Sequence, residues 1–191
     1  YSMSSLAEKS FFKDISNLLP DQKPRLSYGV AVTDFDNDGA DEFIVTGFGY
    51  ENLALGYDGN SLQNKIKENI FSDFNRSTIG VAACDIDKDG QEEIYFLNTD
   101  TYSGQKMYSD RLLKFVDKNI EDLFEKDINQ DELNLTAGRS VVCVDREGKG
   151  NYGIYVANYG GPTRFYEYID NRVVDFCLLY TSPSPRDLST S

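Results

Sequence analysis

The chain has 191 residues, of which 19 are basic and 32 acidic, so its net charge is −13. This balance argues against a nucleic-acid partner, because phosphate binding requires a basic surface. The chain has no histidine, which excludes Ser–His and Cys–His nucleophiles, and no apolar run near the roughly 20 residues of a membrane-spanning helix, so we expect no membrane insertion.

The first 27 residues are expected to form an N-terminal segment with one strand. The stretch FFKDISNLLP (11–20) resembles IEDLF (120–124), which ends a later repeat. We therefore expect an outer strand that is separated from its own sheet. Helix is a minor ingredient, with a few turns expected in SLAEKSFF (5–12) or near NQDEL (129–133).

Three later stretches of the chain resemble one another. They are YGVAVTDFDNDGADEFIVTGFG (28–49), IGVAACDIDKDGQEEIYFLNTD (79–100) and AGRSVVCVDREGKGNYGIYVANYG (137–160). Each reads as a short strand, a tight loop and a β-branched or aromatic strand. A predicted hairpin follows each copy, in NLALGYDGNSLQN (52–64), RLLKFVDKNIEDLF (111–124) and RFYEYIDNRVVDF (164–176).

Repeated units of about four antiparallel strands predict an all-β fold, a β-propeller. Closed propellers have about 4 to 8 blades, so three units and one outer strand cannot close a ring. We therefore expect part of a larger ring. The expected blades span residues 28–78, 79–136 and 137–176.

The first two copies carry acidic loops with the pattern Asp-x-Asp-x-Asp-Gly-x-x-Glu. Side chains at positions 1, 3, 5 and 9 of such a curled loop point inward, whereas position 7 offers only its backbone carbonyl. Sites made of oxygen atoms alone suit Ca²⁺. The predicted ligands are Asp34, Asp36, Asp38, Ala40 and Glu42 in the first loop and Asp85, Asp87, Asp89, Gln91 and Glu93 in the second.

Other interpretations of these loops are weaker. An EF-hand requires a glutamate at position 12 and flanking helices, but position 12 is Val45 or Phe96, inside a predicted strand. Ordinary polar turns are a further alternative, since Asp and Gly are common turn residues. The third copy has Lys149 and Gly153 where the others have acids, so we expect a turn of similar shape there and no calcium.

The repeats resemble FG-GAP repeats, the calcium-bearing propeller blades also found in integrin α chains. YGVAVTD, ACDIDKDGQEEIYFLNT, DRLLKFVDKNIEDL and AGRSVVCVDREGKGNYGIYVANY are similar to the N-terminal half of the cartilage acidic protein 1 (ASPIC/UnbV) family. This resemblance covers residues 11–176. It implies a secreted propeller of about seven blades. It also implies an extracellular matrix or cell-surface protein that binds Ca²⁺ and extracellular proteins or glycans, and is not an enzyme.

A carbohydrate-binding or glycoside-processing propeller is the alternative function. Adjacent strand residues point to opposite faces, so neither Asp41 and Glu42 nor Glu92 and Glu93 form the facing carboxylate pair of a glycosidase. Sugar rings could stack on exposed aromatic side chains, although aromatic residues in strands more often pack in a core. The candidates are Phe48, Tyr50, Tyr102, Tyr159 and Tyr166.

Three further features of the sequence carry expectations. Cys84 and Cys143 could pair, but free buried thiols on strands fit the sequence equally well. The sequons at Asn75 and Asn134 agree weakly with a secreted glycoprotein. The stretch CLLYTSPSPRDLSTS (177–191) has no counterpart in the repeats and resembles a translated adapter sequence; a natural Ser/Pro-rich disordered tail is the alternative.

Overall fold

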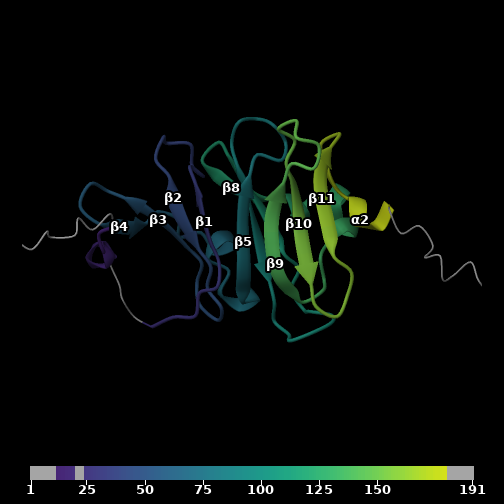
Figure 1. The fold of residues 1–191 in the computed structure, drawn as a ribbon, viewed down its shortest axis with the longest axis horizontal. Helices are drawn as coiled ribbons and strands as arrows, with labels where there is room; N and C mark the ends of the chain where they lie inside the picture. Colours follow the sequence, from purple (N-terminus) through teal and green to yellow (C-terminus); the bar gives the residue numbers. More distant parts are fainter. Residues whose placement is uncertain (1–11, 20–23, 180–191) are drawn as a thin grey trace, which may run out of the picture.

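The computed structural model describes residues 12–19 and 24–179, and these form a mostly β structure (Figure 1). The strands make three four-stranded antiparallel sheets, each with its strands in sequence order. The first sheet contains β1 (Val30–Thr33), β2 (Glu42–Val45), β3 (Leu53–Tyr57) and β4 (Leu62–Asn64). The second contains β5 (Thr78–Cys84), β6 (Glu93–Asn98), β7 (Arg111–Val116) and β8 (Asn119–Asp122). The third contains β9 (Gly138–Val144), β10 (Gly153–Asn158), β11 (Arg164–Ile169) and β12 (Arg172–Asp175).

The three sheets lie side by side along one direction, with β1 beside β5 and β5 beside β9 (Figure 1). The first strand of each sheet is thus the one that contacts the next sheet most directly. This is the arrangement of neighbouring blades in a β-propeller, and it confirms the fold class predicted from the repeats. The helical elements are short: η1 (Ser16–Leu18), α1 (Asn69–Ser72), η2 (Phe74–Arg76), η3 (Leu123–Glu125), η4 (Asp127–Glu132) and α2 (Phe176–Leu179).

Burial of the middle sheet explains the composition of its strands. In β6 every residue is buried, and alternate side chains enter two different hydrophobic clusters. Ile94 and Phe96 pack toward the first sheet, whereas Tyr95 and Leu97 pack toward the third. A strand that is buried on both faces reads as a continuous apolar run. The four central residues of β6, IYFL (94–97), form such a run, and this strand lies in the one of the three sheets that has a neighbouring sheet on each side.

The outer sheets bury one face each. In β2 the side chain of Ile44 is fully buried while that of Phe43 is 44% exposed. In the third sheet Val142 and Tyr155, which are directly opposite each other in β9 and β10, are also exposed. Both outward faces are therefore partly apolar.

The three hairpins form where the sequence predicts them. The β7–β8 and β11–β12 connections have two central residues with positive φ: 49° and 67° at Asp117 and Lys118, 50° and 61° at Asp170 and Asn171. Two consecutive left-handed residues give the type I′ turn that matches the twist of an antiparallel pair. The β3–β4 turn uses Asp58, whose carboxylate accepts hydrogen bonds from the backbone amides of Asn60 and Ser61.

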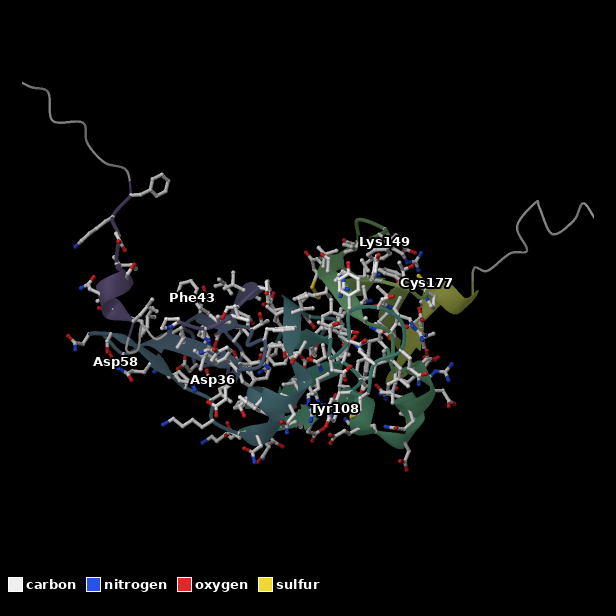
Figure 2. The ribbon with its side chains drawn as sticks, turned by 90° about the horizontal axis from the view of Figure 1, so that it is seen from below. Asp36, Phe43, Asp58, Tyr108, Lys149 and Cys177 are labelled. Carbon is white, nitrogen blue, oxygen red and sulfur yellow. A yellow bond between two sulfur atoms is a disulfide. The ribbon has the colours of Figure 1, made fainter. Side chains whose placement is uncertain are left out.

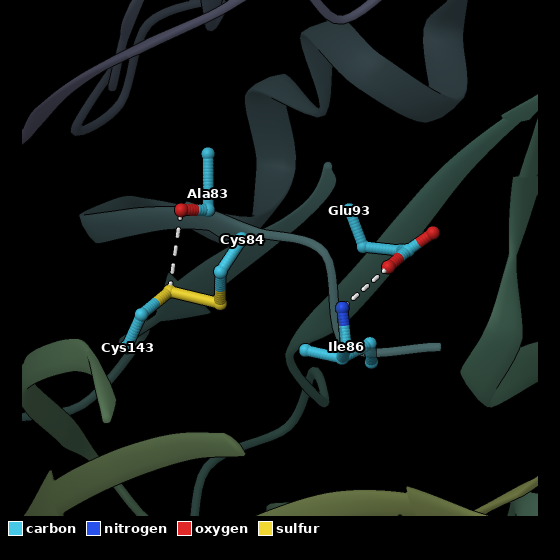
Figure 3. Close-up of a disulfide and its surroundings, with 5 residues drawn as sticks. All are labelled: Ala83, Cys84, Ile86, Glu93 and Cys143. Atoms are coloured by element: carbon cyan, nitrogen blue, oxygen red, sulfur yellow. Dashed lines mark hydrogen bonds between the residues drawn. A yellow bond between two sulfur atoms is a disulfide. The ribbon is translucent and has the colours of Figure 1, made fainter. Parts of the chain in front are cut away.

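Cys84 and Cys143 form a disulfide between β5 and β9, with 6.2 Å between their Cα atoms (Figure 3). The sequence left this pairing open, because the two residues are far apart in the chain and only the juxtaposition of two sheets brings them together. The Sγ atom of Cys143 also lies 3.3 Å from the carbonyl oxygen of Ala83. The second and third sheets are thus joined covalently at their first strands.

Several expectations for the rest of the chain differ from the structure. Residues 12–19 contain the short helix η1 and no strand, so the expected outer strand is not formed there. The turns expected near NQDEL are confirmed as η4, whereas SLAEKSFF lies outside the described residues except for Phe12. Of the tail, residues 180–191 lie outside them too, and 177–179 continue α2.

Candidate metal centre

The first acidic loop connects β1 to β2 and is folded around the carboxylate of Asp34. The two oxygens of this carboxylate accept hydrogen bonds from the backbone amides of Asp38 and Gly39, each at 2.9 Å. Asn37 and Gly39 have φ values of 56° and 89°, a left-handed backbone that lets the chain curl in so few residues. The loop therefore holds its own shape before any ligand is considered.

Three acidic side chains converge inside this loop. Asp34, Asp36 and Glu42 each place an oxygen within 4.8 Å of the other two. Asp38 is not part of this group, and its Oδ1 accepts a hydrogen bond from the amide of Ala40. The structure therefore brings together three of the predicted ligands, with Asp38 and Ala40 on the same turn.

Two carboxylate oxygens in the first loop are buried without a partner. Glu42 is only 2% exposed, and within the part of the chain that the structure describes its Oε2 and the Oδ1 of Asp36 have no hydrogen-bond partner. A buried ionised oxygen without a partner is costly, because it has lost its water and gained nothing in return. A cation bound between these side chains would satisfy both oxygens.

The electrostatics of the first loop point the same way. Burial, together with the negative charge of Asp36, raises the pKa of Glu42 to about 7. Burial and the nearby Asp38 likewise raise the pKa of Asp36. Because the carboxyl groups of this loop are hard to ionise on their own, the loop favours a positive ligand. A bound cation stabilises the charged form of the carboxylates.

The second acidic loop, between β5 and β6, repeats this backbone. Asp85 accepts from the amides of Asp89 and Gly90 at 3.1 and 3.0 Å. The oxygens of Asp85, Asp87 and Glu93 lie within 4.8 Å of one another. Glu93 is fully buried and accepts from the amide of Ile86 at 3.0 Å (Figure 3). Burial is the main cause that raises the pKa of Glu93 to about 7.

Two side chains of the second loop have contacts that the sequence did not suggest. The Oδ1 atom of Asp87 is buried and, among the described residues, has no hydrogen-bond partner. The side-chain amide of Gln91 donates a 2.7 Å hydrogen bond to the carbonyl oxygen of Phe35. Gln91 therefore connects the second loop to the first.

A lysine that the sequence analysis missed enters the second loop from β7. The ammonium of Lys114 donates hydrogen bonds to Asp87, to Asp89 at 2.6 Å and to Glu93 at 3.1 Å. Burial alone would lower the pKa of Lys114, but the three carboxylates outweigh it and raise that pKa above its usual value. The register of β6 and β7 pairs Ile94 with Leu113, which places Lys114 directly across from Glu93.

The third loop has the same outline and different charges. The carboxylate of Asp145 accepts from the amide of Gly150 at 2.6 Å. Glu147 pairs with Lys149 at 2.9 Å, and Glu167 on β11 pairs with Arg146. Lys149 of this loop and Asp36 of the first lie over different sheets (Figure 2). Each acid here has a basic or backbone partner within its own sheet.

The donor sets of the first two loops fit Ca²⁺. Both present carboxylate oxygens on a curled hairpin, without nitrogen or sulfur, which suits a hard cation of high coordination number. Strands flank both loops, and Val45 and Phe96 lie within β2 and β6. The EF-hand arrangement is therefore absent from this part of the chain.

A comparison with known protein families shows which repeat these loops resemble. The model of the FG-GAP-like repeat matches residues 34–96, a range that begins at the first acidic loop and includes the second. This stretch of the chain is similar to the FG-GAP-like repeat. The resemblance predicted from the sequence is thereby confirmed.

The chain is also similar to cartilage acidic protein 1 from several vertebrates. It is 46% identical to the Mus musculus protein and 45% identical to the Homo sapiens protein, each over 186 residues. Each match covers 86% of this chain and 28% of the relative. The Xenopus tropicalis protein is 44% identical over 168 residues, which cover 80% of this chain and 26% of that protein. The chain thus spans little more than a quarter of these relatives.

The other predicted site residues lie apart from the acidic loops. Tyr166 is fully buried against Tyr95, so it offers no surface for a sugar. Asn134 is also fully buried, and its side-chain amide donates to Asp110 and Asn158. Its sequon is therefore closed in this fold, whereas Asn75 is exposed. No helix in the described residues is long and apolar enough to cross a membrane.

Proposed function

We propose that this chain is a calcium-binding segment of a secreted β-propeller that acts as a binding module without catalysis. The observation that carries the proposal is the buried glutamate at position 9 of both acidic loops. Glu42 and Glu93 are each at most 2% exposed and each faces two aspartates. Such a triad is unfavourable without a cation, and it is built twice in the same register.

In this proposal the ion neutralises each loop and holds two strands of one sheet together. The ligands would be Asp34, Asp36, Asp38, Glu42 and the carbonyl of Ala40 in the first loop. The second loop would use Asp85, Asp87, Asp89, Glu93 and the carbonyl of Gln91. Bound Ca²⁺ supplies charge neutralisation and coordination. The chain supplies a preformed turn, since Asp34 and Asp85 already fix the backbone.

Secretion and a binding role are supported by separate features. Disulfides such as Cys84–Cys143 persist in oxidising compartments outside the cytosol, and Asn75 offers an exposed sequon. The relatives are named cartilage acidic protein 1. The proposed partners are extracellular proteins or glycans of the matrix or cell surface.

We also propose that the three sheets are consecutive blades of a larger ring, of about seven blades as the family resemblance implies. The blade boundaries would be 28–78, 79–136 and 137–176. Exposed apolar residues on the outward faces, such as Phe43 on the first sheet and Val142 on the third, support this proposal. In a closed ring further blades would cover both faces.

The test of calcium binding is thermal melting of the full chain in Ca²⁺, in Mg²⁺ and in EDTA. With free Ca²⁺ at roughly 100 times the dissociation constant, the melting temperature should rise by about 5–10 °C. Mg²⁺ should have a smaller effect, because it retains its water in crowded carboxylate sites. An unchanged melting temperature at millimolar Ca²⁺ would overturn the proposal.

Matched variants test whether the calcium-dependent rise in melting temperature comes from the two acidic loops. Asp36, Asp87 and Glu147 occupy position 3 of the first, second and third loops. Combining Asp36→Asn with Asp87→Asn should abolish the calcium-dependent rise. Glu147→Gln should leave the rise intact, because Glu147 already pairs with Lys149.

Carbohydrate binding is a second candidate, favoured by one cavity. Residues Tyr28, Phe48, Tyr102 and Arg139 line a surface cavity of about 450 Å³. Tyr102 is 79% exposed and, with Tyr159, lies against the guanidinium of Arg139. Aromatic faces and a cation are groups that bind sugars and acidic glycans. Glycan-array binding that is lost in Tyr102→Ala and kept in Tyr57→Ala would support this function.

A further inference from the structure

One position of the repeat differs in charge among the three sheets. In each sheet, the second residue of the second strand lies opposite a residue of the third strand. These pairs are Phe43 with Leu55, Ile94 with Leu113 and Ile154 with Tyr166. The next residue of the third strand faces position 9 of the acidic loop. This facing residue is Gly56, Lys114 or Glu167 in the first, second and third sheets.

In the first sheet the facing position leaves the loop open. Gly56 has no side chain, and a Cβ atom there would lie 3.1 Å from Oε1 of Glu42. The side chain of Lys65 crosses this glycine. Among the described residues, however, Lys65 forms no ion pair with the loop, and two oxygens of the loop remain without partners.

In the second sheet the facing residue puts a cation inside the loop. Lys114 is mostly buried and bonds to Asp87, Asp89 and Glu93, the side chains at positions 3, 5 and 9. A divalent ion that uses these oxygens must first displace the ammonium. Displacement costs three charge-assisted hydrogen bonds and leaves two positive charges near each other.

We propose that Lys114 is an internal counter-ion that makes the second loop the weaker of two calcium sites. The inference rests on the proposed function, and it adds that the loops fill in order, the first before the second. In metal-free protein Lys114 holds the second loop closed. When calcium enters, the lysine side chain leaves the loop and the ion takes its place on Asp87, Asp89 and Glu93.

The experiment is calorimetric titration of the full chain with Ca²⁺ alone. Two binding events should appear, with dissociation constants that differ by about tenfold or more. Asp36→Asn should remove the tighter event, and Asp87→Asn the weaker one. Lys114→Met should tighten the weaker event by about tenfold, whereas Lys114→Arg, which keeps the charge, should not.

Two further variants keep the test independent of folding defects. Lys149→Met changes the net charge by the same amount in the third loop, where the only ion pair of Lys149 among the described residues is an exposed one with Glu147. It should leave both events unchanged. Gly56→Lys introduces the competing cation in the first loop and should weaken the tighter event. Circular dichroism checks that each variant keeps its β structure.

The outcomes separate the two proposals. If two events of equal affinity appear and Lys114→Met changes neither, the role of Lys114 is overturned while calcium binding stands. The role of Lys114 is also overturned, and calcium binding also stands, if Asp87→Asn removes the tighter event. If neither the natural chain nor Lys114→Met binds Ca²⁺, the proposed function fails and the inference fails with it. Binding that appears in the second loop only in Lys114→Met supports the inference strongly.

Discussion

The ammonium of Lys106 and the carboxylate of Asp110 form an ion pair in which neither side chain is exposed to solvent. Asp110 also accepts hydrogen bonds from the hydroxyl of Tyr95 at 2.7 Å and from the side-chain amide of Asn134 at 2.6 Å. Lys106 donates to the carbonyl oxygen of Asn98 at 2.9 Å. Through this network, the loop between β6 and β7 is bonded to Tyr95 and Asn98 of β6 in the second sheet.

Removing one partner of this pair should destabilise the chain strongly. Burial lowers the pKa of Lys106, against the opposing pull of Asp110, so the pair depends on both members. Lys106→Met leaves Asp110 buried without a counter-charge and should lower the free energy of unfolding by about 3–5 kcal/mol in urea denaturation. Lys126→Met, which breaks an exposed pair, should cost at most about 1 kcal/mol. Equal losses in the two variants would contradict the prediction.

The disulfide should contribute measurably to stability. Replacing both Cys84 and Cys143 with serine should lower the free energy of unfolding by about 2–5 kcal/mol, because the unfolded chain regains the freedom that the cross-link removed. Chemical denaturation with and without a reducing agent measures the same difference. Cys177→Ser is the control, since Cys177 is a free thiol and should show no such loss. A reductant-insensitive denaturation midpoint in the natural chain would count against the bond.

Stability in EDTA should fall as the pH rises from about 4.5 through 7. The pKa values of Glu42 and Glu93 are raised to about 7 in the folded chain, mainly by burial. A carboxyl with a raised folded pKa favours the folded state while it is protonated. That contribution is lost as the pH passes from the unfolded pKa to the folded one, on the order of a few kcal/mol in total.

Melting temperatures measured across this pH range check the prediction. Glu42→Gln combined with Glu93→Gln should flatten the profile, because glutamine does not ionise. Saturating Ca²⁺ should reverse the trend, since the ion stabilises the ionised form that EDTA leaves unfavourable. A melting temperature in EDTA that rises with pH would contradict the raised pKa values of Glu42 and Glu93.

Glycosylation should distinguish the two sequons. Asn75 is exposed on η2, whereas Asn134 is fully buried and hydrogen-bonded on its side-chain nitrogen. Expression through a secretory pathway should therefore give a glycan at Asn75 and an unmodified Asn134, as read by mass spectrometry before and after glycosidase treatment. Asn75→Gln should abolish the mass shift. A folded, secreted chain that carries a glycan on Asn134 would contradict this structure.

Features that depend on neighbouring residues were predictable from the sequence. The hairpins follow from Asp, Asn, Lys and Gly at turn positions and from apolar residues on either side. The acidic loops follow from their Asp-x-Asp-x-Asp-Gly pattern, and their strands from β-branched and aromatic residues. Each signal is local and is repeated in the chain, so one copy supports the interpretation of another.

Features that depend on one sheet contacting another were not predictable in this way. The entry of Lys114 into the second loop was not predictable either, because it depends on the exact register of β6 and β7 within the second sheet. The burial of Tyr166 and Asn134, and the pairing of Cys84 with Cys143, require the second and third sheets to be in contact. The outer strand expected in residues 11–20 resembled a strand in sequence, but within residues 12–19 the chain forms the short helix η1 and pairs with no sheet.

The bond between Cys84 and Cys143 also determines how the chain responds to mechanical tension. The two cysteines are 59 positions apart, and the second acidic loop lies between them. A force that pulls the ends of the chain apart bypasses this interval, because the load passes through the sulfur atoms. Stretching would therefore extend the first acidic loop while the second stays slack.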